Sequence, residues 1–552
     1  MICTVCGVRH ASGTESALPT DPNAGRFPLS SLADFRFLLD PPAGRHGFLR
    51  VDRGGRFVWP SGRRARFWGV NISSRSVWVE RGEIDRVVEV LARSGANMVR
   101  FEALDSVGGL LDTPGSATSR QIDPAKLEIL DYWIARLRAR GIYCYLNLLD
   151  FRRFRDGDGI PEAERLGPAA RPYALWDPGL MQLQKEFARD LLLHRNRHTG
   201  LRYVEDPALA LVEVCNEHGF FLRPEALDSL AEPYATGLRQ RWNTWLLKRH
   251  GSREGIRKAW GMAGGDPVLA ADEDPAIYSV RLPRLAEGPV VAGGVVDTRL
   301  APARMRDGVQ FLHEVQRAYF REMRAFLRGI GVRVPIAGVV SNHVPADVAS
   351  AARELDFTSE NYYADHPAFA GREWEGAFFF NNTNPLRFSS TFHLAPWLSA
   401  LRWEGKPVVV REWATVWPNR YRAVAVPEMA AYAGLQDFDA VLLFGYQVRH
   451  KPEQLSDFDH QADPTVWGLF GLGAVSFLRG DVQPSRQRVT LAYAPDALFR
   501  WPSGLTSLHR LSWLARLNST QTPGPSTERE LVLAASDSFG LERALKWLSA
   551  SP

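Results

Sequence analysis

The chain has 552 residues, of which 45% are hydrophobic and 23% are charged, and its formal net charge is +5. This composition is typical of a globular protein and excludes a disordered one. The small positive excess contains no long basic block, so nucleic-acid binding is not indicated.

The first 25 residues are rich in Gly, Pro, Ser and Thr, and we expect them to form a flexible arm. Cys3 and Cys6 form a C-x-x-C pair, but no second ligand pair follows at zinc-site spacing, so no metal is predicted. Neither a signal peptide nor an apolar run of membrane-spanning length is found. These features predict a cytoplasmic protein, or a secreted one if the start site is misassigned.

Short strand-like pieces at residues 35–39, 47–51 and 57–60 are separated by Gly and Pro and predict a small N-terminal β layer. Strand-like and helix-like segments then alternate. The expected strands are residues 66–72, 97–101, 142–148, 208–216, 335–340, 355–361, 407–412 and 440–446. The expected helices are residues 80–94, 124–140, 178–194, 232–250, 306–330, 396–404, 427–436 and 466–478.

Eight strand–helix units predict an α/β fold, a closed (β/α)8 or TIM barrel, over residues 26–482. Insertions are expected at residues 251–305 and 362–395. Residues 483–552 lack the alternation and are interpreted as a C-terminal extension or a truncated accessory region. No G-x-G-x-x-G follows the first strand, which argues against a dinucleotide-binding fold.

Two of the expected strands, the fourth and the seventh, end on a glutamate. The fourth reads LALVEVCNE up to Glu217, and the seventh reads PVVVREW around Glu412. Polar groups at the C-terminal ends of barrel strands face one common site. A single glutamate there is more simply a structural ion pair, but two of them favour a site with paired carboxylates.

With these motifs the chain resembles the clan A glycoside hydrolases, especially the cellulase-type family 5 enzymes. The resemblance covers most of residues 26–482. It rests on motifs that occur in the same order: residues 67–71, Arg100, residues 194–200, the Asn216–Glu217 pair, residues 363–367, Glu412 and residues 417–422.

The resemblance implies a retaining O-glycoside hydrolase that cleaves β-linked sugars by double displacement. Glu217 would be the general acid/base, Glu412 the nucleophile, and Asn216 a ligand of the sugar 2-hydroxyl. Arg100 and Tyr363 would hold Glu412 ionised and correctly aimed. Two carboxylates that divide the work in this way need no metal and no cofactor.

The chain also departs from the family pattern. Glu102-Ala103 and Leu149 stand where relatives often carry His, and Asn361 replaces a His two residues before Tyr363. A carbohydrate-binding pseudoenzyme or a transglycosidase therefore remains an alternative. Asn361, Trp413 and Tyr446 are candidate substrate contacts, the last two as exposed rings that stack on a sugar. The expected partner is an oligosaccharide or glycoside, with no nucleic acid and no membrane, and the oligomeric state stays open.

Overall fold

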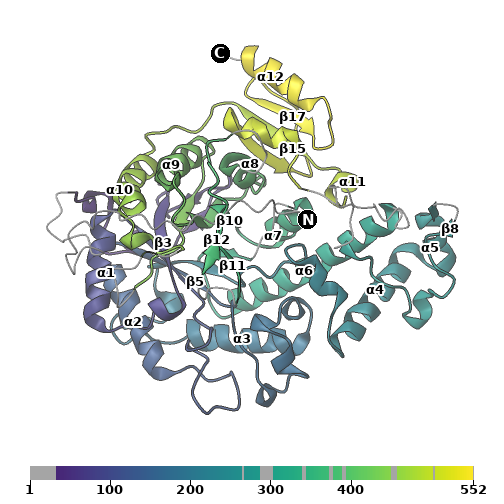
Figure 1. The fold of residues 1–552 in the computed structure, drawn as a ribbon, viewed down its shortest axis with the longest axis horizontal. Coiled ribbons are helices and arrows are strands. Elements are labelled where there is room, and N and C mark those ends of the chain that lie inside the picture. Colours follow the sequence, from purple (N-terminus) through teal and green to yellow (C-terminus); the bar gives the residue numbers. More distant parts are fainter. Residues whose placement is uncertain are drawn as a thin grey trace.

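A computed structural model describes residues 33–263, 266–285, 302–338, 344–371, 377–387, 393–448, 455, 457–501 and 504–550. Eight parallel strands form its main sheet (Figure 1). In spatial order they are β10 (Thr358–Asp365), β13 (Val408–Thr415), β14 (Ala440–Leu443), β3 (Phe67–Ser73), β4 (Met98–Glu102), β5 (Tyr143–Asn147), β6 (Leu209–Glu213) and β9 (Ile336–Ala337).

The two ends of this sheet, β9 and β10, also meet. The backbone N–H of Asp356, just before β10, donates to the carbonyl oxygen of Ile336 at 2.9 Å. The hydroxyl of Ser359 lies 3.4 Å from the carbonyl oxygen of Gly338. The ring of strands is therefore the predicted (β/α)8 barrel, and its strands are buried on both faces as their apolar sequences require.

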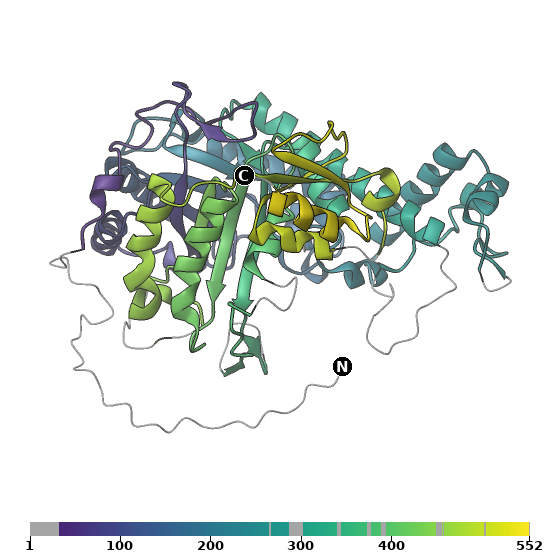
Figure 2. The ribbon, with the colours of Figure 1, turned by 90° about the horizontal axis from the view of Figure 1, so that it is seen from above.

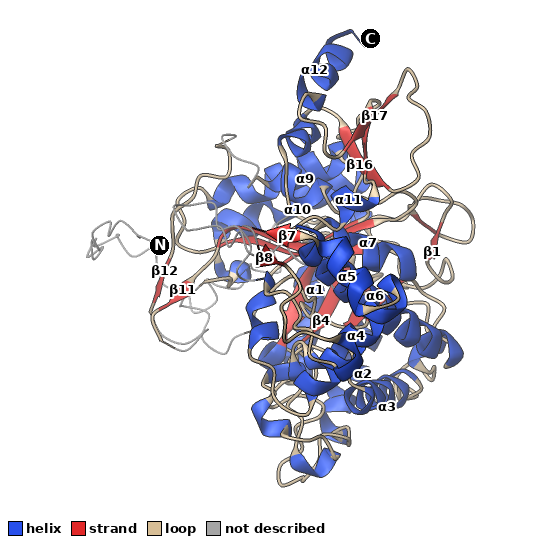
Figure 3. Ribbon diagram, turned by 90° about the vertical axis from the view of Figure 1, so that its right-hand side faces the viewer, coloured by secondary structure: helices blue, strands red, loops and turns tan. Residues whose placement is uncertain are grey.

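Helices surround the strands (Figure 3). Around the barrel they are α1 (Arg81–Arg93), α2 (Pro124–Ala139), α3 (Pro178–Leu192), α6 (Pro302–Gly329), α7 (Pro345–Glu354), α8 (Leu394–Ser399), α9 (Ala425–Leu435) and α10 (Pro464–Arg479). Local sequence explains their positions. In α2, Asp123 accepts a hydrogen bond from the Ala125 N–H at 2.8 Å, and Pro124 occupies the first turn, where its missing N–H costs nothing.

Some boundaries differ from the sequence predictions. Residues 35–39 form no strand, because a single 3-10 turn spans Arg36–Leu38. The β layer is reduced to β1 (Arg50–Val51) paired with β2 (Phe57–Val58). The fourth barrel strand stops at Glu213, so Asn216 and Glu217 lie in the loop that follows it.

Two further parts extend from the barrel. Helices α4 (Tyr234–His250) and α5 (Arg253–Trp260) project to one side with the start of α6 (Figure 1). At the other end of the chain, β16 (Arg516–Thr520), β15 (Arg488–Ala492) and β17 (Glu530–Ala534) form a parallel sheet beside α12 (Gly540–Ala550). The Gln436 side chain joins this part to α9 by donating to the carbonyl oxygens of Ser512 and Ala515.

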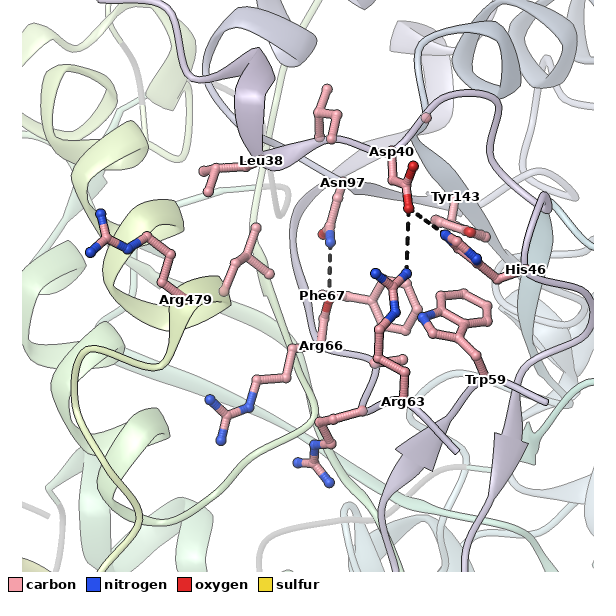
Figure 4. Close-up of a pocket in the computed structure, with 15 residues that line it drawn as sticks. Leu38, Asp40, His46, Trp59, Arg63, Arg66, Phe67, Asn97, Tyr143 and Arg479 are labelled. Atoms are coloured by element: carbon pink, nitrogen blue, oxygen red, sulfur yellow. Dashed lines mark hydrogen bonds and ion pairs between the residues drawn. The ribbon is translucent and has the colours of Figure 1, made fainter. Parts of the chain in front are cut away.

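A hollow of about 350 Å³ lies where β3 and β5 begin, next to Phe67 and Tyr143. There the His46 ring and the Arg63 guanidinium both point towards the Asp40 carboxylate (Figure 4). This is the N-terminal end of the barrel, where side chains usually serve stability. In the part of the chain that the structure describes, no helix is long and apolar enough to cross a membrane.

Candidate active site

The two predicted glutamates share one hydrogen-bond partner at the C-terminal end of the barrel strands. Glu412 lies in β13 and is 4% exposed, whereas Glu217 follows β6 and is partly exposed. The side-chain amide nitrogen of Asn361, on β10, donates to Oε1 of Glu217 at 2.7 Å and to Oε2 of Glu412 at 2.9 Å. The two carboxylate oxygens can therefore be no farther apart than the sum of these distances.

An irregularity in β13 places Glu412 inside the barrel. Glu360 of β10 pairs with Val410, but the next residue, Asn361, pairs with Glu412, so Arg411 is an extra residue in β13. In a regular strand, neighbouring side chains point to opposite faces. The bulge instead lets two successive side chains point inwards. The Arg411 guanidinium contacts Glu213 and donates to Oδ1 of Asn361 at 2.8 Å.

Arg100 connects the groups at the centre of the barrel. Its side chain is fully buried in β4. One terminal nitrogen lies 3.1 Å from Oε1 of Glu412, and the other lies 3.0 Å from Oε2 of Glu213 and 3.1 Å from Oδ1 of Asn216. The Tyr363 hydroxyl donates to Oε2 of Glu412 at 2.7 Å. The structure thus brings both Arg100 and Tyr363 within hydrogen-bond distance of Glu412.

The pKa of Glu412 is raised, although Arg100 and Tyr363 were expected to favour its charged form. Burial raises the pKa of its carboxyl above the usual range, while Arg100 lowers it and the charge of Glu217 raises it further. The Arg100 guanidinium and the Tyr363 hydroxyl therefore only partly offset burial. Burial and the charge of Glu412 raise the pKa of Tyr363 well above its usual value, so Tyr363 remains a hydrogen-bond donor.

Three further buried carboxylates were not singled out from the sequence: Glu213, Glu102 and Asp150. Burial would raise the pKa of Glu213, but Arg100 and Arg411 outweigh it, and the pKa is lowered. Burial raises the pKa of Glu102 well above its usual range and that of Asp150 to about 8. In the sequence, Glu213 could have been recognised as a charged residue within an apolar strand.

Asn216 lies among these carboxylates. Its amide nitrogen donates to Asp150 at 3.0 Å and lies 3.4 Å from Glu102, and its oxygen accepts from Arg100. The position next to Glu217 is consistent with a ligand of the sugar. A sugar hydroxyl would, however, meet an amide that already has protein partners on both of its polar atoms.

Trp413 and Tyr446 do not present the exposed rings that we expected; each is 2% exposed. The ring of Trp413 lies 5.9 Å from that of Trp68, on the helix side of the barrel. The ring of Tyr446 packs edge-on against Trp467 of α10 at 5.1 Å. The prediction of two stacking platforms is therefore wrong. After the bulge, Glu412 faces the interior, so the next side chain must face the helices.

The backbone at Glu217 is unusual, since its φ is +49°. Left-handed backbone costs a non-glycine residue on the order of 1 kcal/mol or more, and such residues cluster at functional sites. Ala103, in the loop after β4, also has a positive φ of +54°. Both residues belong to loops at the C-terminal ends of the barrel strands, where a barrel carries its site.

Glu360 gives this region a pH-dependent stability. Its buried carboxylate accepts a hydrogen bond from the Asn361 N–H at 2.9 Å, and burial raises its pKa to about 8. In the unfolded chain a glutamate ionises near ~4.3. Between these pH values the folded state binds a proton that the unfolded state has lost. The contribution of Glu360 to the free energy of unfolding is therefore complete below about pH 4. It is lost as the pH rises towards 8.

We expect Glu360→Gln, which cannot ionise, to become more stable relative to wild type as the pH rises. The difference in the free energy of unfolding should grow by up to ~1.4 kcal/mol per pH unit. Urea unfolding at pH 5, 6, 7 and 8 measures it, and Glu164→Gln, at an exposed position, is the control. If the free energies of unfolding of Glu360→Gln and wild type changed with pH in the same way, the raised pKa of Glu360 would be contradicted.

Among the described residues, no group of three or more His, Cys, Asp or Glu side chains is arranged to hold a metal ion. Cys3 and Cys6 lie outside the described residues, as do parts of both expected insertions. Cys144 and Cys215 are both buried within the barrel. The groups described at the candidate site are therefore carboxylates, amides, guanidinium groups and a phenol.

No family model matches the chain, and a comparison with curated proteins finds no match. Solved structures do match. A β-galactosidase from the psychrophilic Marinomonas ef1 has a TM-score of 0.52 at 14% identity, over 87% of this chain and 74% of that one. A polyextremophilic β-galactosidase from Halorubrum lacusprofundi has 0.51 at 17% identity, over 78% and 61%. A family 5 mannosidase from Rhizomucor miehei has 0.46 at 12% identity, over 79% and 98%.

At these identities the likeness shows the fold alone. The chain has the (β/α)8 barrel that is also found in glycoside hydrolases of known structure.

Proposed function

We propose that this protein is a glycoside hydrolase of the clan A type that cleaves β-linked sugars with retention of configuration. The observation that carries the proposal is the single amide of Asn361 that hydrogen-bonds Glu217 and Glu412. One carboxylate on β13 and one in the loop after β6 meet at the barrel end where such enzymes carry out their chemistry. The fold shared with two β-galactosidases supports the same class of enzyme.

The spacing of the carboxylates favours retention over inversion. Retaining glycosidases hold the two carboxyl groups ~5–5.5 Å apart, whereas inverting enzymes need ~6.5–9.5 Å to admit a water molecule. The hydrogen bonds of 2.7 and 2.9 Å to Asn361 keep Oε1 of Glu217 and Oε2 of Glu412 closer together than the separation that inverting enzymes need. Direct attack by one carboxylate on the anomeric carbon is therefore the better-supported reaction.

In the proposed reaction, Glu412 attacks the anomeric carbon while Glu217 donates its proton to the departing glycosidic oxygen. The products of this step are a covalent glycosyl ester and the free leaving group. Glu217, now ionised, then takes a proton from water, and the resulting hydroxide displaces Glu412 from the sugar. Arg100 and Tyr363 donate to the Glu412 carboxylate at 3.1 and 2.7 Å, which stabilises its charge when it departs.

A panel of nitrophenyl β-glycosides, including the galactoside, glucoside and mannoside, tests this function. Glu217→Ala should lower kcat/KM by about 10²–10⁴-fold for substrates whose leaving group needs a proton. For an activated dinitrophenyl glycoside, whose leaving group departs unprotonated, the loss in kcat/KM should be much smaller. Equal losses for both substrates would contradict the role of Glu217.

Other outcomes separate the alternatives. Sugar binding without turnover of any glycoside would instead indicate a carbohydrate-binding protein of the same fold. Transfer of the sugar to an added acceptor in preference to water would indicate a transglycosidase, which uses the same first step.

A further inference from the structure

A small apolar cluster adjoins the candidate active site and is separate from the main cores of the barrel. Ala414, Val416 and Phe458 form its buried centre, and Tyr363, Phe378, Phe380 and Phe444 pack against it. The chain supplies it from β10, from the end of β13, from the loop after β14, and from a hairpin. The centre is buried, whereas the four aromatic side chains packed against it are partly exposed and can contact a ligand.

The hairpin consists of β11 (Ala368–Phe369) and β12 (Phe378–Phe379), and it extends beyond the ends of the barrel strands (Figure 2). Phe369 pairs directly with Phe378, and their ring centroids are 5.7 Å apart. Side chains alternate along the strand, so Phe378 and Phe380 face the cluster and Phe379 faces away. In agreement, Phe379 is 59% exposed and lies outside the cluster.

We call Phe369, Phe378, Phe380, Phe444 and Phe458 the phenylalanine wall. Tyr363 connects it to the reaction centre. The Tyr363 hydroxyl donates to Oε2 of Glu412 at 2.7 Å, and its ring centroid lies 4.9 Å from that of Phe458 and 6.1 Å from that of Phe444. The wall therefore begins one side chain away from the proposed nucleophile.

The chemistry of the wall selects its ligand. Four of its rings, those of Phe369, Phe378, Phe380 and Phe444, are partly exposed. Phenyl rings offer no hydrogen-bond donor or acceptor, unlike the Trp and Tyr rings that combine an apolar face with a polar edge. His366 borders the wall, with its ring 5.4 Å from that of Phe458. A second sugar placed against the phenyl rings would leave the hydroxyls that face them without partners, which is costly in a desolvated site. An alkyl chain or an aryl group carries no such cost and gains from burial.

We propose that the phenylalanine wall binds the apolar aglycone of the substrate, so that the protein cleaves glycosides of alkyl or aryl alcohols rather than chains of sugars. This inference rests on the proposed glycosidase function and specifies its substrate class. The leaving group protonated by Glu217 is then an apolar alcohol, held beside Tyr363 while Glu412 takes the sugar.

A series of alkyl β-glycosides tests the inference, with methyl, butyl, hexyl and octyl glycosides of the sugar that the nitrophenyl panel identifies, all below their micellar concentrations. The alcohols of this series have similar acidity, so the bond-breaking chemistry stays nearly constant. We expect kcat/KM to rise by about threefold to fourfold for each methylene that the wall buries. The octyl glycoside should also be cleaved faster than the disaccharide of the same sugar.

Matched variants of the hairpin test whether the rise of kcat/KM with chain length comes from the phenylalanine wall. Phe378→Ser and Phe380→Ser should each lower kcat/KM for the octyl glycoside by about tenfold or more, and by a much smaller factor for the methyl glycoside, which has no chain to bury. Phe379→Ser removes the same ring from the opposite face of the hairpin and should change neither value. Thermal unfolding of each variant shows whether the fold is retained.

The two proposals can fail separately. If no glycoside is hydrolysed at all, the proposed function fails. If the nitrophenyl glycoside is hydrolysed but kcat/KM does not depend on chain length, the inference about the aglycone is overturned while the glycosidase function stands. Equal losses in Phe378→Ser and Phe379→Ser would also overturn it.

Discussion

Replacing Glu412 by alanine is expected to reduce kcat/KM for an aryl β-glycoside on the order of 10⁵-fold, the scale on which enzymes lose activity with their nucleophile. Without the carboxylate no glycosyl ester can form, and water would have to attack unaided. The neighbouring Asn361, Arg100 and Tyr363 side chains remain, so the variant retains most of the site. Initial rates with the substrate chosen from the nitrophenyl panel measure the loss.

Azide tests the assignment more directly than the loss of activity. In Glu412→Ala it can enter the space left by the carboxylate and attack the anomeric carbon from that face. The product should be a glycosyl azide of inverted configuration, which NMR identifies. In Glu217→Ala the ester still forms on Glu412, so azide should give the retained product. Wild-type turnover in Glu412→Ala, or a retained azide from it, would rule out Glu412 as the nucleophile.

Arg100→Met is expected to have the largest effect on stability. The fully buried guanidinium contacts Glu412, Glu213 and Glu102 within 3.1 Å. Breaking a buried ion pair by removing one partner costs ~3–5 kcal/mol, because a buried charge is left without compensation. Loss of the guanidinium should also raise the pKa of Glu412 further, which moves the acid limb of the kcat/KM profile to higher pH.

Urea unfolding of the variants separates these effects. Adding Glu213→Gln to Arg100→Met should recover part of the lost free energy of unfolding, because the uncompensated charge is removed as well. Arg136→Met, which removes one partner of an exposed pair with Asp85, is the control and should cost at most ~1 kcal/mol. If Arg100→Met costs no more than this control, Arg100 does not hold the site together.

Much of the barrel could be predicted from the sequence, because most strands are short apolar runs and most helices have apolar residues at helical spacing. Helix α7 was not predicted, and β10 has a largely polar sequence. The pair of glutamates could be located for the same reason, since each follows such a run. The boundaries of the strands were less predictable. Strand β6 ends at Glu213, but the apolar run continues to Cys215 because Val214 and Cys215 are also buried. Val214 still donates to the carbonyl oxygen of Ala337 in β9 at 2.9 Å.

The orientation of side chains around Glu412 could not be predicted. Alternation along a regular strand fixes which residues face the interior, but the extra Arg411 shifts this pattern by one residue. A bulge depends on the partner strand, β10, and leaves no local signal in the sequence of β13. The bulge explains why Arg411 also faces the interior. The expectation for Trp413 was wrong for another reason, because alternation after the inward-facing Glu412 already directs Trp413 to the helices. Glu213, Glu102 and Asp150 were missed because a carboxylate acquires its role only from neighbours on other strands.

The bulge in β13 also limits how this site could be transferred to another protein. If the residues around Glu412 were grafted onto a regular strand of a designed barrel, either Arg411 or Glu412 would be directed among the helices. A designer would have to copy β10 and β13 as a pair, with their uneven register, to keep both side chains in the interior. The smallest unit that would carry over the placement of Glu412 is thus two adjacent strands and not a sequence motif.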